Sequence, residues 1–96
     1  MLQIINQIFE IEKKSNDQSI SIFERNFERI HHELQEMGYT VSNPLGKSYD
    51  TRDTSVEANI VGNSSNPIIT KVLKPAIFQN DGTGMVLLQK GIVIAE

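Results

Sequence analysis

Three groups of residues in this 96-residue chain have types and spacings that could do chemistry. The first is the pair His31 and His32, which could form a weak metal site with Glu28 or Glu36 one helical turn away. Adjacent residues of a helix point about 100° apart, however, and the chain contains no further histidine. The sequence therefore favours a solvated helix face for this pair.

The second group consists of acidic residues in the middle of the chain. Asp50, Asp53 and Glu57 offer carboxylate oxygens of the kind that bind divalent cations. The segment lacks the central glycine of a calcium-binding loop. Capping of turns is the favoured interpretation of these carboxylates.

The third group is the glycine-rich segment 82–84, Gly-Thr-Gly, which superficially resembles a phosphate-binding loop. No predicted helix follows it to offer free amides to an anion, so a hairpin turn is favoured. No serine has an evident histidine and acid partner for nucleophilic catalysis. We therefore expect a protein that is not an enzyme and that needs no cofactor or metal.

Composition and charge exclude several of the remaining classes of function. The chain has no cysteine, which excludes disulfides, thiol chemistry and cysteine zinc sites. Residues 1–38 carry four basic and seven acidic residues, and hence the whole formal net charge of −3. No basic cluster indicates a nucleic-acid partner. Apolar runs such as 85–88 are too short to span a membrane and no signal peptide is evident, so we expect a cytoplasmic location.

The hydrophobic period of the chain changes once, at Gly38. Before it, apolar residues recur at spacings of three and four, which is typical of a helix that packs against another helix. This spacing predicts a dimerisation seam formed by Ile20, Phe23, Phe27, Ile30, Leu34 and Met37. Gly38 then ends the helix, because glycine readily adopts the left-handed conformation after a last turn.

The helical part could be one long helix or two consecutive ones. The stretch 13–19 is polar throughout, and Ser15, Asn16 and Asp17 have side chains that could cap the start of a new helix. We favour two segments that are continuous or nearly so. Together they would form a helical stalk, residues 1–38.

Beyond Gly38, β-branched residues and turn signals predict a meander of short strands. Strands are expected near 56–60, over 68–78 and over 85–95, after a loop at 45–54. Pro75 should lie at an edge or a bulge, and Gly91 at a bulge or a close approach of another backbone. The predicted fold class is α+β, with the stalk followed by a small antiparallel β-domain, residues 39–96.

Several segments of this part resemble the GrpE nucleotide-exchange factors. Segments 37–41 (Met-Gly-Tyr-Thr-Val), 43–50 (Asn-Pro-Leu-Gly-Lys-Ser-Tyr-Asp) and 56–58 (Val-Glu-Ala) are similar to the family's Phe-Gly-Val, Pro-x-Gly-x-x-Phe-Asp and His-Glu-Ala. Segments 72–76 (Val-Leu-Lys-Pro-Ala) and 88–91 (Leu-Gln-Lys-Gly) are similar to its closing Val-Leu-Arg-Pro-Ala and Val-Leu-Gln-Lys-Gly-Tyr. In this chain the order of these two closing signatures is reversed.

The resemblance implies a homodimeric co-chaperone that does no chemistry itself. Its β-domain would bind a DnaK-type chaperone ATPase, or a divergent relative, and open the nucleotide cleft so that ADP leaves. We expect the partner-binding residues to be Tyr49, Asp50, Glu57, Lys74, Pro75, Lys90 and Gly91. Phe78 is a further candidate, although packing in the core is favoured for it. The alternative is a non-enzymatic adaptor or assembly subunit whose helix completes a partner's helical bundle.

Overall fold

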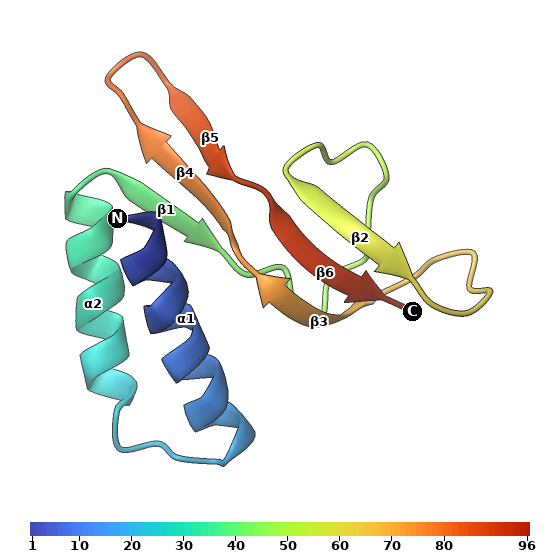
Figure 1. Ribbon diagram of the computed structural model, residues 1–96, viewed down its shortest axis with the longest axis horizontal. Coiled ribbons are helices and arrows are strands. Elements are labelled where there is room, and N and C mark those ends of the chain that lie inside the picture. The colour runs from blue at the N-terminus through green and yellow to red at the C-terminus, as the bar shows by residue number, and fades with distance from the viewer.

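The computed structural model describes residues 1–96 and shows two helices followed by six strands (Figure 1). The helices are α1, Leu2–Asp17, and α2, Glu24–Glu36. The strands are β1 (Tyr39–Ser42), β2 (Val56–Ile60), β3 (Ile69–Lys74), β4 (Ala76–Asn80), β5 (Met85–Gln89) and β6 (Gly91–Ala95). They form two three-stranded sheets, in the orders β1-β4-β5 and β2-β6-β3. The predicted α+β class and the change of structure at Gly38 are confirmed.

Two consecutive helices are present because α1 ends in a left-handed turn at Ser19, whose φ is 56°. The Ser19 amide donates to the Asn16 carbonyl (3.0 Å), and the Ile20 amide donates to the Ser15 carbonyl (2.8 Å). This pair of bonds satisfies the last carbonyls of many helices, usually with glycine at the left-handed position. The predicted cap of a new helix at residues 15–17 is therefore wrong, since these residues close α1.

The two helices run antiparallel and lie along the first sheet, next to β1 (Figure 1). Ile5 of α1, Leu34 of α2 and Ile77 of β4 form a buried cluster. His31 Nε2 and Glu12 Oε1, 2.9 Å apart, join the helices above β1. The helical part is thus a hairpin packed on the sheet, because Ile5 and Leu34 find apolar partners within the chain.

A second buried cluster forms inside the other sheet and also includes α1. Phe9 packs there with strand residues from β2, β3 and β6, namely Val56, Ile69, Val72, Val93 and Ala95. Ile5 and Phe9 lie four residues apart and so share one face of the helix. One helix thus anchors both sheets, and the segments 1–38 and 39–96 share both clusters.

Each of the two predicted long strands is divided in the structure. β3 passes into β4 at Pro75, and β5 passes into β6 at Lys90. The two halves pair antiparallel with each other, β4 with β5 and β3 with β6. Register shifts flank Pro75 on both sides, as expected for a residue that cannot donate to a ladder. This long hairpin crosses from one sheet to the other, and we call the region around Pro75 and Gly91 the crossover.

The prediction of a wholly antiparallel β-domain is wrong in one pair of strands. β2 runs parallel to β6, from the pair Val56 and Gly91 to the pair Ile60 and Ala95. Parallel neighbours need a long connection between them. Here β3, β4 and β5 lie between β2 and β6 in the chain and provide it, whereas hydrophobic alternation alone does not distinguish the two directions.

Candidate protein-binding site

The crossover brings together five of the seven residues predicted to contact a partner. They are Glu57, Lys74, Pro75, Lys90 and Gly91. Lys90 Nζ lies 3.6 Å from Glu57 Oε1, and the Gly91 amide donates to the carbonyl of Ser55 (2.8 Å). We call these five residues the crossover site.

Gly91 is buried where the two strands of the long hairpin lie against each other. A Cβ atom at this position would lie 3.2 Å from the amide nitrogen of Ala76 and 3.4 Å from the carbonyl oxygen of Lys74. The predicted close approach of another backbone is thus confirmed. Pro75 is also buried, so these two residues shape the crossover site from beneath, and the charged side chains form its exposed part.

The charges of the crossover site differ in how they are compensated. Lys90 and Glu57 form an exposed ion pair, which is worth little in free energy. Lys74 is exposed and has no carboxylate within ion-pair distance. A free cation on a rigid strand can steer an acidic partner surface and fix its orientation.

A side-chain network ties helix α1 to the crossover. The amides of Asn6 and Gln89 exchange two hydrogen bonds, of 2.8 Å and 2.9 Å, and Gln89 Nε2 also donates to the carbonyl of Pro75 (2.9 Å). Local sequence patterns do not indicate this contact, since the two amides are 83 residues apart. The one available signal was Gln89 itself, a polar residue directly after the apolar run 85–88.

The other two predicted contact residues lie in the loop before β2, away from the charges of the crossover site. Tyr49 is half-buried and packs against the second cluster. Asp50 is exposed, and side-chain and backbone hydrogen bonds from Arg52 hold the pKa of its carboxyl below the ordinary value. Tyr49 thus supports the core, and Asp50 stabilises a turn. Phe78 is half-buried beside Leu87 and belongs to neither buried cluster.

The residues first considered for chemistry do not assemble into a reactive centre. No group of three histidine, aspartate or glutamate side chains gathers anywhere in the chain. Asp53 accepts hydrogen bonds from the amide and hydroxyl of Ser55, and Asp81 from those of Thr83. The bonds from Thr83 lower the pKa of Asp81. These contacts agree with the turn-forming interpretation of the acidic residues and of segment 82–84.

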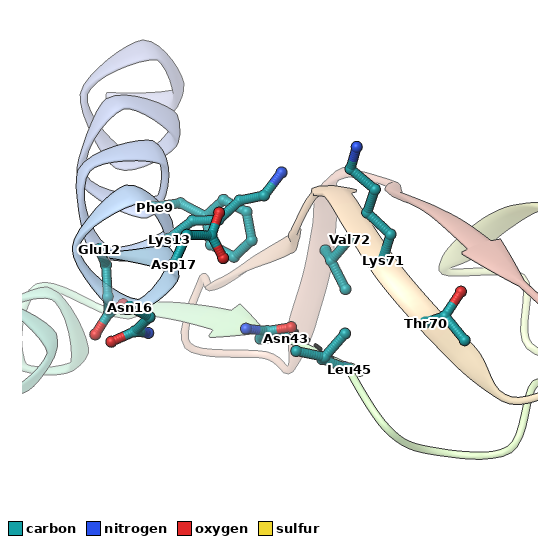
Figure 2. A pocket seen from close by; sticks show the side chains of 10 residues that line it. All are labelled: Phe9, Glu12, Lys13, Asn16, Asp17, Asn43, Leu45, Thr70, Lys71 and Val72. Atoms are coloured by element: carbon teal, nitrogen blue, oxygen red, sulfur yellow. Dashed lines mark hydrogen bonds between the residues drawn. The ribbon is translucent and has the colours of Figure 1, made fainter. Parts of the chain in front are cut away.

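An open groove runs between α1 and β3 (Figure 2). Phe9, Leu45 and Val72 are its apolar residues, while Lys13 and Lys71 extend at its rim from opposite walls. The groove has a volume of about 450 Å³, enough for a few side chains of a partner. No sequence pattern indicated it, because its walls come from three separate segments.

The predicted dimerisation seam is divided by the fold. Leu34 is 6% exposed and packs inside the chain with Ile30. Ile20 and Phe23 precede α2, and together with Met37 they remain exposed. α1 adds exposed apolar residues that the seam did not include, above all Ile4 and Ile11. The apolar surface of the helical hairpin is thus made by both helices.

Comparison with protein-family models, with curated proteins and with solved structures gave no match. Neither helix has the length and apolar character needed to cross a membrane.

Proposed function

We propose that this chain is a GrpE-like regulator that binds a DnaK-type chaperone ATPase, or a divergent relative, through the crossover site and promotes nucleotide exchange. The observation that carries the proposal is the position of the two reversed signatures. Segments 74–76 (Lys-Pro-Ala) and 89–91 (Gln-Lys-Gly) lie opposite each other across the crossover. A cytoplasmic location, expected from the sequence, belongs to the same proposal.

The geometry gives a physical reason why the signatures can trade places. The two strands of the hairpin meet at a point where a Cβ on one of them would press against the backbone of the other. Glycine on one of the two strands avoids this tight contact, and the other strand can carry Pro-Ala. Exchanging the signatures keeps glycine against a backbone and leaves a lysine on each strand. The reversed order is thus compatible with the family resemblance.

The proposed activity is differential binding without a chemical step. A regulator shifts its partner toward the open, nucleotide-free state only as far as it binds that state more tightly, and each tenfold preference corresponds to about 1.4 kcal/mol. The free ammonium of Lys74 and the Lys90–Glu57 pair lie on strands fixed by Gln89 and α1. A fixed backbone beneath these side chains limits the entropy lost on binding to that of the side chains themselves, which supports discrimination between two partner states.

The functional test measures the release of labelled ADP from a cognate DnaK-type ATPase. We expect the wild-type chain to accelerate release and Lys74→Glu to reduce this acceleration by roughly tenfold, the effect of one contact of about 1.4 kcal/mol. Lys47→Glu is the matched control, because it makes the same charge change at an exposed residue whose carbonyl accepts from Ile69, at the opposite end of β3 from Lys74. Unchanged release with the wild-type chain would refute the proposal.

We also propose that the chain forms a homodimer through the exposed apolar side chains of its helical hairpin. Ile4 and Ile11 are seven residues apart on α1 and so lie on one face of it, and Phe23 and Met37 flank α2. A helix that leaves such a face uncovered usually packs against another helix. Two hairpins packed face to face would cover it in both copies.

Ile11→Asp is expected to convert this dimer to a monomer in sedimentation velocity. Ile11 is 54% exposed, so the substitution leaves the buried clusters intact and a folded monomer should result. Asn16→Asp adds the same charge at an exposed position on another side of the helix, so it is the control and should remain dimeric. A wild-type chain that already sediments as a monomer contradicts the helical dimer.

The same apolar helix residues favour a second candidate function, an adaptor whose helices complete a partner's bundle. This alternative requires a stable complex with a different protein and no effect on ADP release. An affinity capture that recovers only copies of the chain itself would count against the adaptor. The two functions are therefore separated by the exchange assay and by the composition of the captured complex.

A further inference from the structure

Strand β5 leaves one edge of the first sheet open. In the order β1-β4-β5 it is the outermost strand, whereas its continuation β6 is central because β2 pairs beside it. The pairing of β2 begins at Val56 and Gly91. The outer side of the long hairpin is therefore covered along β6 and uncovered along β5.

The open edge presents free backbone groups at alternate residues. The Asn80 amide donates to the Gly38 carbonyl on the β1 side of β4 (2.8 Å), so Asn80 and its neighbour Met85 do not exchange bonds with each other. Because pairs alternate along an antiparallel ladder, Val86 bonds toward β4, and Met85 and Leu87 direct their amides and carbonyls outward. These groups can pair with a further strand.

The side chains of β5 also suit pairing. Met85, Val86, Leu87 and Leu88 are consecutive apolar residues with 37–51% of their surface exposed. Proteins usually protect a free sheet edge with charged residues or proline, and none occurs between 82 and 89. The outer strand β2 of the other sheet, by contrast, carries the exposed polar residues Glu57 and Asn59.

We infer that β5 pairs antiparallel with β5 of a second copy of this chain, joining the two first sheets across a two-fold axis. The charges around the edge are self-complementary in sign, since Asp81 precedes β5 and Lys90 follows it. Within its own chain Lys90 forms only the exposed ion pair with Glu57, at 3.6 Å, so it can also face a second carboxylate. Antiparallel pairing centred on Leu87 places Lys90 of one copy opposite Gly84 of the other. Asp81, whose amide bonds to Gly84, then lies two strand spacings away, roughly 10 Å, within reach of a lysine side chain. Parallel pairing would instead bring like charges together.

This contact is distinct from the helical dimer proposed above and is weaker. Pairing five residues per copy buries less than the approximately 1,000 Å² that a stable interface needs. We therefore expect association that rises with concentration and persists when the helical face is disrupted. In the free protein this strand pairing covers the apolar edge strand β5.

The test uses Ile11→Asp as the background, so that only the strand contact remains. In sedimentation equilibrium, adding Leu87→Pro should weaken the residual association at least tenfold, because proline removes an outward amide that bonds to nothing within the chain. Leu87→Ala keeps this amide and should weaken the residual association less. Equal effects of the two substitutions, or no residual association before either is made, would overturn the inference.

A second measurement does not depend on the fold of the proline variant. The chain has no cysteine, so a single introduced thiol reports one contact. Leu87→Cys should form a disulfide-linked dimer under mild oxidation, because the residue on a two-fold axis faces its own copy. Thr70→Cys, exposed on β3, should remain monomeric on a non-reducing gel. Equal cross-linking of the two variants, or none at position 87, would also overturn the inference.

Discussion

Replacing Ile77 by alanine is expected to destabilise the folded chain by about 2–5 kcal/mol, the range for removing a large buried aliphatic side chain. Ile77 is 0% exposed and lies between Ile5 of α1 and Leu34 of α2. The substitution leaves a cavity where both helices meet the first sheet. A domain of this size has a total stability of only about 5–15 kcal/mol, so the loss would be a large part of it.

Urea unfolding followed by circular dichroism measures this loss. Ile60→Ala is the matched control, because it removes the same atoms at a half-exposed site on β2. We expect this substitution to cost less than about 1 kcal/mol. If the helices were an independent stalk, Ile77→Ala would leave helical signal intact while the strands unfold. A single transition that includes the helical signal is the expected result, since both clusters contain α1. A loss below 1 kcal/mol would contradict the packing.

The sequence revealed the features that depend on local conformation. Gly38 was predictable as the end of a helix because a helix end depends on local backbone geometry, and its observed φ of 91° agrees with that prediction. The close approach at Gly91 and the irregularity at Pro75 were predicted from the missing side chain of one and the missing amide of the other. The turn at Ser19 escaped prediction because serine stands where such a cap normally has glycine.

Features that depend on tertiary packing were not predictable in the same way. The heptad spacing correctly marked Leu34 as a packing residue, but spacing does not say whether the partner is another copy or the chain's own sheet. The parallel pairing of β2 depends on which strand lies beside it. The bond between Asn6 and Gln89 joins opposite ends of the chain. Five of the predicted contact residues thus lie together at the crossover, whereas their support by α1 was not predictable from local sequence.

Gly91→Ala is expected to cost about 1–3 kcal/mol, the usual range for forcing extra volume into a packed site. The added methyl would lie 3.2 Å from the amide nitrogen of Ala76, and a backbone atom cannot rotate away as a side chain does. The remaining glycines of the chain all have positive φ, whereas at Gly91 the lack of space is the constraint. The loss of stability in Gly91→Ala therefore reports how closely the two strands approach at this position.

The double variant Gly91→Ala with Ala76→Gly tests whether the two signatures are exchangeable across the crossover. Ala76→Gly alone should cost roughly 1 kcal/mol, the usual penalty of glycine within a regular element. The Ala76 Cβ would lie 3.6 Å from the new methyl at position 91. Removing this Cβ lets β4 shift, which relieves the contact between the methyl and the backbone of residue 76. We expect the double variant to be more stable than the two separate losses predict, with a coupling of at least about 0.5 kcal/mol in urea unfolding. Additive losses would show that glycine is required on β6 specifically, and the reversed order would then count against the GrpE-like proposal.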